Sequence, residues 1–333
     1  MHFVIVGAGA LGSIYAAYLA RAGHRVSLIA RGERAAALAS HGVAVEGKDS
    51  FSARCAIVTQ PDSLRSADVV IVAIKTYDTV QALAPLRGLK AGSALSVQNG
   101  VLKNQQLSEV FGPQATLGAV GMLGGQVLAA KNGAPGAVRY NVVGPTIIGE
   151  TAGGESARVQ ELVDALVNAG LEARAANDIS SIEWSKFVGW SGFSTLAVMT
   201  RLPTWRFMTD PDTALIAARV MRETAAVAMR HGVTLQDSGF SSKAFLDGSE
   251  QDAVRAAQAH GEKMRLNAPD FRQSILQDAD RNRRLEVHET LDYTLELAAK
   301  YGVATPTLEL CCRVLRAVSR AASQAQQPSV NRS

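Results

Sequence analysis

The sequence predicts an α/β N-terminal domain built on a mostly parallel sheet, followed by an all-α C-terminal domain. In the first half, short runs rich in Val and Ile alternate with helical patterns, which is typical of a parallel sheet with crossover helices. Beyond residue 177 the apolar residues recur with a helical period. We therefore expect domains at 1–177 and 178–322, and a disordered polar tail at 323–333.

In the N-terminal domain, the first strand is predicted over residues 2–7, and the helix after it is expected to end at Gly23. Further strands of the same sheet are predicted at 25–30, 68–75 and 93–100. Short strands at 137–141 and 146–150 are expected to close this sheet, and a helix is predicted at 162–170.

In the C-terminal domain, long segments rich in Ala and Leu predict helices throughout. The breaks between these helices are expected at Pro203, Pro211, Gly232, Gly248, Pro269 and Gly302.

Composition argues against several classes of protein. No apolar run is long enough to span a bilayer, and the N-terminus carries no signal-peptide pattern, so we expect no membrane segment and a cytoplasmic location. The net charge of +4 is small and the basic residues are scattered, which argues against nucleic acid as a partner. Cys55, Cys311 and Cys312 form no disulfide framework and lack further ligands at metal-binding spacing, so no metal site is expected.

A glycine-rich segment joins the first strand to the first helix: Gly7-Ala8-Gly9-Ala10-Leu11-Gly12. A dinucleotide-binding fingerprint requires this context. We expect Gly7 to make the turn, Gly9 to let the backbone approach a pyrophosphate, and Gly12 to let helix and strand pack closely. The segment predicts a dinucleotide-binding Rossmann domain, and a tight turn without a ligand is the alternative.

The end of the second strand indicates which dinucleotide binds. A protein that binds NAD usually places Asp or Glu there, whereas this chain has Ala30 followed by Arg31. A guanidinium suits the 2′-phosphate of NADP(H) through charge-assisted hydrogen bonds, so we expect NADP(H) as the cofactor. The alternative interpretation is that Arg31 is a solvated loop cation.

Two polar side chains stand at the ends of later strands, Lys75 in "AIKTYDT" and Asn99 in "VQNGV". Ligands of open α/β sheets bind beyond the carboxyl ends of the strands, so both side chains are expected to face the nicotinamide side. Because Asn-Gly is also a strong turn signal, an ordinary turn at Asn99 is an equal alternative.

In the helical domain, Lys186 lies within "SIEWSKFVGW". An ion pair with Glu183 on a solvated helix face would explain this lysine without any function. At helical spacing, however, Lys186 shares its face with Trp190, Phe193 and Ala197, which are apolar. This pattern weakens the solvated interpretation without removing it.

Together these residues resemble the ketopantoate reductases, or 2-dehydropantoate 2-reductases, of pantothenate synthesis. The resemblance extends to about residue 318 and rests on the order and spacing of "GAGALG", "VAIKTYDT", "VQNGV", "PGAVRY", "GPTIIG", "WSK", "SILQD", "RRLEV" and "YGVATPTLE". It implies NADPH-dependent reduction of a 2-oxo acid to a 2-hydroxy acid, in a cleft between a Rossmann domain and a helical domain.

The resemblance also implies roles for single residues. Lys186 is similar to the family's catalytic lysine, which would give a proton to the ketone oxygen. Glu286 is similar to the family's glutamate, which would steer the lysine ammonium or hold the substrate hydroxyl. Asn99 and Lys75 would face the cofactor and the substrate, and Ser274 would bind the substrate carboxylate.

The surroundings of Glu286 leave two interpretations open. On a helix, Glu286 would line up with Thr290, Tyr293 and Leu297, a partly apolar stripe that predicts an inward-facing carboxylate. Without the resemblance, an ion pair with a neighbouring arginine, Arg283 or Arg284, on a solvated face would be favoured.

Three positions depart from the family pattern. Trp190 and Ser194 stand one and two helical turns after Lys186, where asparagines are common, and Phe271 stands where another substrate-binding asparagine is common. We expect Trp190 and Ser194 to line the substrate pocket. The alternatives to ketopantoate reduction are therefore reduction of another branched or aromatic 2-oxo acid, or a protein that senses NADP without turnover. A homodimer is compatible with either.

Overall fold

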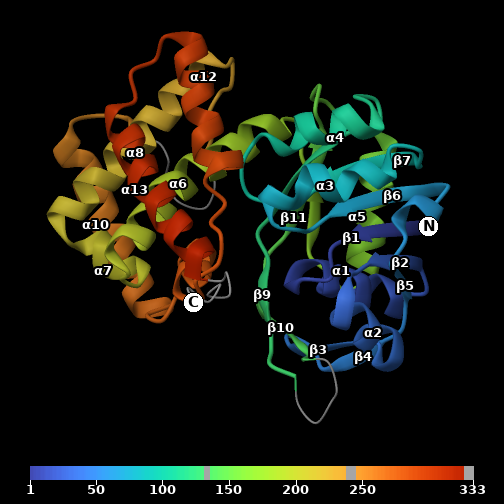
Figure 1. The fold of residues 1–333 in the computed structure, drawn as a ribbon. Coiled ribbons are helices and arrows are strands. Elements are labelled where there is room, and N and C mark those ends of the chain that lie inside the picture. Colours follow the sequence, from blue (N-terminus) through green and yellow to red (C-terminus); the bar gives the residue numbers. More distant parts are fainter. Residues whose placement is uncertain (131–135, 238–244, 326–333) are drawn as a thin grey trace, which may run out of the picture. The chain divides into compact units, whose positions relative to one another are not determined.

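The chain forms two compact units. The computed structural model describes residues 1–130, 136–237 and 245–325, and the chain divides into unit 1, Met1–Ser180, and unit 2, Ser181–Ser333. The division lies three residues after the boundary expected at Asn177, inside helix α6 (Ile179–Thr200). Figure 1 shows the strands in the blue to green part of the chain, which is unit 1.

The centre of unit 1 is a five-stranded parallel sheet with the order β5-β2-β1-β6-β7. Its strands are β1 (His2–Val6), β2 (Arg25–Ile29), β5 (Ala56–Val58), β6 (Ser66–Val72) and β7 (Lys90–Ser96). Alternate residues of β1 enter two different apolar cores, with Phe3 and Ile5 in one and Val4 and Val6 in the other. Both faces of the sheet are thus buried, which explains why β1 does not alternate with polar residues.

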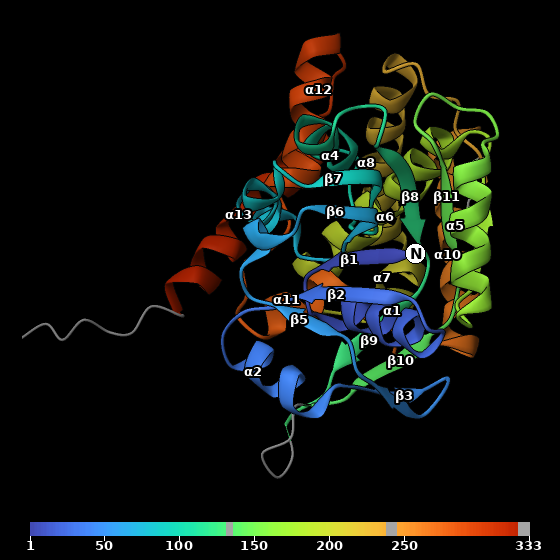
Figure 2. The ribbon, with the colours of Figure 1, turned by 90° about the vertical axis from the view of Figure 1, so that its right-hand side faces the viewer.

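Helices supply the other half of each core. The helices of unit 1 are α1 (Ala10–Arg21), α2 (Gly32–His41), α3 (Thr79–Leu83), α4 (Lys103–Phe111) and α5 (Ala157–Asn168), with short 3₁₀ turns η1 (Pro61–Ser63), η2 (Thr76–Asp78) and η3 (Ala84–Leu86). Residues of α1 and α5 share the core of Phe3, and residues of α3 and α4 share the core of Val4. Figure 2 shows the parallel strands side by side between these elements.

The strands expected to close the parallel sheet lie in two other sheets, so that prediction is wrong. One sheet has the order β4-β3-β10-β9 and the other β12-β11-β8. Their strands are β3 (Val43–Gly47), β4 (Phe51–Ala53), β8 (Leu117–Gly121), β9 (Gly124–Val127), β10 (Val138–Val142), β11 (Thr146–Glu150) and β12 (Ala173–Ala175). β10 pairs antiparallel with β9 and β11 antiparallel with β8. Antiparallel partners need no crossover helix, and periodicity does not reveal which strands pair.

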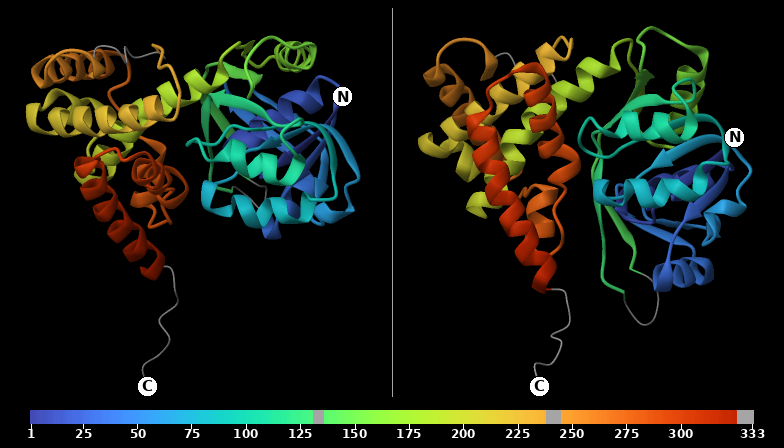
Figure 3. Two further views of the ribbon diagram at one scale, coloured as in Figure 1. Left: turned by 90° about the horizontal axis from the view of Figure 1, so that it is seen from above. Right: turned by 45° about the horizontal axis from the view of Figure 1, so that its top comes forward.

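Unit 2 contains only helices and connections in its described part, the yellow to red chain of Figure 3. After α6 come α7 (Thr204–Thr209), α8 (Pro211–Arg230), α10 (Glu250–Asn267), α11 (Ser274–Asp280), the π-helix η4 (His288–Asp292), α12 (Tyr293–Tyr301) and α13 (Pro306–Ala325). The expected prolines and glycines lie next to the helix ends. Pro211 begins α8, and Gly302 ends α12 in the left-handed conformation.

Side chains cap several of these helices. Asp210 accepts from the backbone N–H of Thr213 at the start of α8, and Ser249 and Asp252 form a capping box at the start of α10. The Glu223 carboxylate of α8 accepts from the N–H groups of Thr307 and Leu308, at 3.0 and 2.7 Å, and so caps α13 from a neighbouring helix.

The predicted disordered tail begins too early. Helix α13 continues to Ala325, so residues 323–325 are helical, and the remainder of the predicted tail lies outside the described residues. Ala322 is still buried, so the apolar face of α13 persists to residue 322, and the last turn of the helix continues from it. Of the helices in the described ranges, none combines the length and the apolar character needed to cross a bilayer.

Candidate functional site

The glycine-rich turn between β1 and α1 is shaped by two close approaches. Gly7 has a φ of +106°, and a Cβ there would lie 2.3 Å from the Ile74 side chain. A Cβ at Gly12 would lie 1.9 Å from the carbonyl oxygen of Gly7, so only glycine lets α1 begin directly over the end of β1. Gly9 differs, because a Cβ there would meet nothing nearer than the Ala73 oxygen at 3.9 Å.

This difference indicates a ligand-facing role for Gly9. The residue is exposed, and its extended backbone would accommodate a side chain. Packing therefore does not explain this glycine, whereas close approach of a pyrophosphate to the first turn of α1 does. Ala8, Ala10 and Leu11 pack against the core beneath, which holds the turn in place. The residues present thus fit a dinucleotide.

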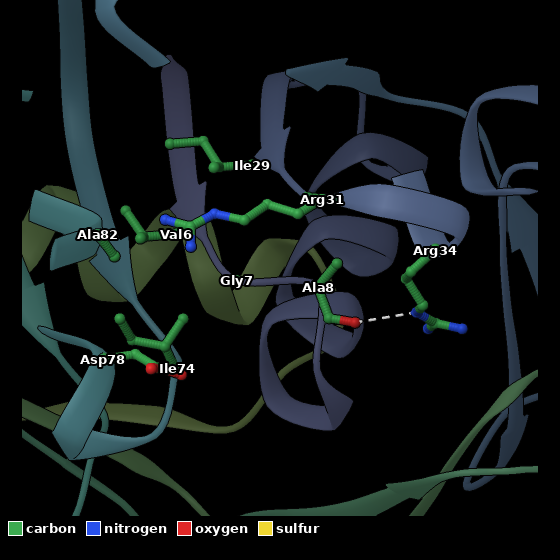
Figure 4. Close-up of a pocket in the computed structure, with 10 residues that line it drawn as sticks. Val6, Gly7, Ala8, Ile29, Arg31, Arg34, Ile74, Asp78 and Ala82 are labelled. Atoms are coloured by element: carbon green, nitrogen blue, oxygen red, sulfur yellow. Dashed lines mark hydrogen bonds between the residues drawn. The ribbon is translucent and has the colours of Figure 1, made fainter. Parts of the chain in front are cut away.

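A pocket of about 210 Å³ opens beside the turn. It is lined by Val6, Gly7, Ala8, Ile29, Ala30, Arg31, Arg34, Ile74, Asp78 and Ala82, which come from the ends of β1, β2 and β6 and from the helices that follow. Figure 4 shows Arg31 extended across this pocket and Arg34 turned toward the carbonyl of Ala8. Arg31, the predicted phosphate-binding residue, therefore lies in the same pocket as Gly7 and Ala8.

Arg34, for which the sequence analysis predicted no role, stabilises the glycine-rich turn by hydrogen bonds. Its guanidinium donates to the Ala8 oxygen at 3.1 Å, the Gly136 oxygen at 3.2 Å and the Ser13 hydroxyl at 3.3 Å. Burial lowers the pKa of Arg34, because desolvation disfavours its charge. Arg34 lies in the first turn of α2, where the helix dipole disfavours a cation. An arginine at such a position is the feature of the sequence that could have indicated a specific role for Arg34.

Lys75 and Asn99 occupy two neighbouring loops rather than strand ends. β6 ends at Val72 and β7 at Ser96, so Lys75 and Asn99 each lie three residues beyond the end of the strand. Both side chains are half-buried, and neither lines the pocket beside the glycine turn. The side chain of Gln98 joins the two loops, since its amide nitrogen donates to the Ile74 oxygen at 3.0 Å.

In unit 2, the environment of Lys186 is not a solvated helix face. Glu183, its suggested partner on such a face, is only 6% exposed, and Lys186 itself is half-buried. The prediction of a solvated helix face around Lys186 and Glu183 is therefore wrong. α6 is buried on nearly all sides, and Phe193 and Ala197 of the Lys186 stripe belong to the core of unit 2.

Trp190 packs within an aromatic row along α6. Its ring stacks on Phe187 with 5.6 Å between centroids, and Phe187 in turn meets Trp184 edge to face at 6.0 Å. Trp190 is 8% exposed, so most of its indole is buried in this conformation. Packing and a role at the edge of a pocket are both compatible with this placement.

The other candidate residues of unit 2 come from separate elements. Ser194 is fully buried on α6, and its hydroxyl has no hydrogen-bond partner among the described residues. Ser274 is exposed as the first residue of α11. α6 and α11 share one core, to which Val188 and Leu276 contribute.

Glu286 is buried but does not lie on a helix, which corrects the predicted stripe. It precedes the π-helix η4, in a stretch that Leu285 ties to α13 by donating to the Ser319 hydroxyl at 3.0 Å. Its side chain is 4% exposed, so the solvated ion-pair interpretation is wrong as well. Thr290 donates to the main-chain oxygen of Glu286. No group of three or more metal-ligating side chains occurs in the described ranges.

Comparison with known proteins gives consistent results over both units. A family model described as "Ketopantoate reductase PanE/ApbA" matches residues 3–153, and one described as "Ketopantoate reductase PanE/ApbA C terminal" matches residues 178–319. The 2-dehydropantoate 2-reductase of Mesorhizobium japonicum is 28% identical over 341 residues, which cover 95% of this chain and 97% of that protein.

Solved structures agree with these matches. The 2-dehydropantoate 2-reductase of Geobacter metallireducens GS-15 superposes with a TM-score of 0.78 at 25% identity, covering 95% of this chain and 99% of that one. A D-mandelate dehydrogenase bound to NADH and anilino(oxo)acetate superposes with a TM-score of 0.81 at 20% identity, covering 97% and 99%. The second likeness shows a common fold.

The two kinds of glycine should respond differently to alanine. Gly12→Ala should destabilise the protein by about 3 kcal/mol, because backbone must shift to admit the Cβ. Gly9→Ala should leave the melting temperature nearly unchanged and weaken NADPH binding by roughly tenfold, about 1.4 kcal/mol. Thermal denaturation and fluorescence titration measure the two effects. Unchanged NADPH affinity in Gly9→Ala would support a turn without a ligand.

Proposed function

The chain belongs to the ketopantoate reductase family, and from this premise we propose that it catalyses the NADPH-dependent reduction of 2-dehydropantoate to pantoate. The observation that carries the proposal is the family match over both units. It is supported by the glycine turn, in which no packing contact requires Gly9 to be glycine. The chain is accordingly an oxidoreductase. Its place in pantothenate synthesis and in the cytoplasm, and a homodimeric state, remain predictions.

We infer NADP(H) rather than NAD(H) from Arg31. Arg31 is exposed, follows β2 directly and lines the pocket beside Gly7. No acidic side chain stands at this strand end to accept hydrogen bonds from ribose hydroxyls, since Ala30 and Arg31 occupy the place. A guanidinium with no hydrogen bond among the described residues is suited to bind a 2′-phosphate.

In the proposed mechanism, NADPH held at the glycine turn would supply the hydride that the keto carbon of the substrate accepts. The substrate oxygen then gains negative charge, and Lys186 stabilises it by donating a proton from its ammonium group. Partial burial of Lys186 favours this role, because a cation acts more strongly where water is restricted. Glu286, buried in its loop, would orient the lysine or hold the substrate hydroxyl.

The remaining assignments concern binding. Lys75 and Asn99, half-buried in adjacent loops, would contact the cofactor and substrate, and the exposed hydroxyl of Ser274 would receive the substrate carboxylate. Trp190 and Ser194 would border the substrate. Ser194 is wholly buried here, so its contact with substrate requires an opening around α6.

A second candidate function is reduction of another branched or aromatic 2-oxo acid. Trp190 favours it, because an indole offers one donor and a large apolar surface where an asparagine would offer a donor and an acceptor. The likeness in fold to a D-mandelate dehydrogenase fits this candidate. A sensor without turnover has less support, since it needs neither Lys186 nor the buried Glu286. NADPH oxidation measured across a panel of 2-oxo acids, ketopantoate included, tests all three.

Arg31→Ala should lower the preference for NADPH over NADH by about tenfold to thirtyfold, up to about 2 kcal/mol, because the charge-assisted contact to the 2′-phosphate is lost. The measurement is kcat/KM with each cofactor. Arg25→Ala removes a charge from the opposite end of β2 and serves as the control. An unchanged preference in Arg31→Ala would refute the assignment of Arg31.

Lys186→Met should reduce kcat by about a hundredfold to ten-thousandfold, with NADPH affinity near that of the parent, because the ammonium acts on the ketone oxygen. Steady-state kinetics and NADPH titration separate the two effects. Lys263→Met, an exposed lysine of α10, is the control. Parental kcat in folded Lys186→Met would leave the lysine without a catalytic role.

Trp190→Asn should shift substrate preference toward ketopantoate, because the amide can pair with its hydroxyl, whereas an apolar pocket discriminates by only about a hundredfold or less. Loss of the stack on Phe187 will also lower stability, so relative kcat/KM for ketopantoate and 2-oxoisovalerate is the deciding quantity. Trp190→Phe keeps an apolar ring as the control. Lower stability with unchanged relative kcat/KM would mean that Trp190 serves packing alone.

A further inference from the structure

A buried polar network joins the loops that carry Lys75 and Asn99. Gln98 is 7% exposed, and its side-chain amide nitrogen donates to the Ile74 oxygen at 3.0 Å and to the Thr79 hydroxyl at 2.8 Å. Its side-chain oxygen accepts from the Ser96 hydroxyl at 2.7 Å. A single glutamine thus spans from the end of β7 to the loop after β6.

Lys103 binds the main-chain oxygen of Gln98. Its ammonium donates to the main-chain oxygen of Gln98 at 3.1 Å and to that of Ala119 in β8 at 2.5 Å. The side chain is only 4% exposed. Lys103 is also the first residue of α4, where the helix dipole disfavours a cation. Both burial and position oppose a lysine here, so its carbonyl contacts are the feature that accounts for it.

Two of the carbonyl groups bound in this network, those of Ile74 and Gln98, directly precede Lys75 and Asn99 in the chain. The Ile74 carbonyl belongs to the peptide that carries the nitrogen of Lys75, and the Gln98 carbonyl belongs to the peptide that carries the nitrogen of Asn99. Fixing each carbonyl fixes the plane of that peptide, and thereby the direction in which the next residue leaves the backbone. The network therefore acts on the two residues proposed to face the cofactor.

We propose that Gln98 and Lys103 are positioning residues, which act through Asn99 and Lys75 to place these side chains at the nicotinamide end of the cofactor. The inference rests on the proposed function of Asn99 and Lys75. Lys103 itself donates to main-chain carbonyls and touches neither cofactor nor substrate in this assignment. Small displacements of a positioned group reduce catalysis strongly, so the effect of losing Lys103 should appear in turnover.

The first test separates the two ends of the cofactor. Lys103→Met keeps the length of the side chain and removes the ammonium. Its affinity for NADPH should fall at least threefold, whereas its affinity for 2′-phospho-ADP-ribose, which lacks nicotinamide, should stay within twofold of the parent. Lys48→Met is the matched control, because the ammonium of Lys48 also donates to a main-chain oxygen, that of Gly170 at 2.8 Å, on the exposed surface. Equal losses for both ligands, or for neither, would overturn the proposal.

The second test asks whether Lys103 acts through Asn99. Lys103→Met should lower kcat at least tenfold in the parent and less than threefold in an Asn99→Ala background, because the residue that it positions is then already absent. Equal losses in both backgrounds would mean a general structural effect and would overturn the proposal. If circular dichroism shows Lys103→Met to be unfolded, Gln98→Met replaces it in both tests.

Failure of the proposed function would be distinguishable. If the parent protein reduces no 2-oxo acid but binds NADPH, the proposed reduction fails, and the comparison of NADPH with 2′-phospho-ADP-ribose still decides the positioning role.

Discussion

The start of α1 directly over the end of β1 is the constraint on which unit 1 depends. A side chain at Gly12 would overlap the carbonyl of Gly7, so the helix can begin there only with glycine. Because α1 begins there, its first N–H groups follow Gly9 directly, and a Cβ at Gly9 would meet nothing nearer than the Ala73 oxygen at 3.9 Å. The pocket lies beside this junction, and Arg31 lines it. Arg34 donates to Ala8 and Ser13 of the same junction. One packing contact thus positions the candidate cofactor site.

Sequence reasoning succeeded where local chemistry decides the structure. The glycine turn, the parallel strands and the helix ends at Pro211 and Gly302 follow from residue types at short range. It failed where partners are distant. Nothing in the period of β10 or β11 shows which strand each one pairs with. An α-helical period predicts Glu286 on a helix with Thr290, whereas η4 is a π-helix that begins at His288, and its wider turn shifts that register.

Helix α6 shows how a buried element can hold polar residues. The Ser185 hydroxyl accepts from the N–H of Gln236, and the Ser191 hydroxyl donates to the oxygen of Val188 within α6 and contacts the Thr224 hydroxyl of α8. These bonds satisfy side chains that would otherwise destabilise the core. The contacts with Gln236 and Thr224, which lie outside α6, also restrict the rotation of α6 about its axis, and with it the direction of Lys186. Apolar periodicity alone could not have predicted that rotation, because α6 is apolar on nearly every face.

The unequal surroundings of Arg31 and Arg34 bear on cofactor engineering. Arg31 is exposed and its guanidinium has no hydrogen bond within the described ranges, whereas the Arg34 guanidinium donates to three oxygens, including that of Ala8 in the glycine turn. Substitutions at position 31 can therefore change the charge presented to a ribose phosphate without disturbing the protein. Substitutions at position 34 would release the turn. A library aimed at exchanging the redox carrier should vary Arg31 and its exposed neighbour Glu33, and keep Arg34 fixed together with Gly32, whose φ of +55° favours glycine.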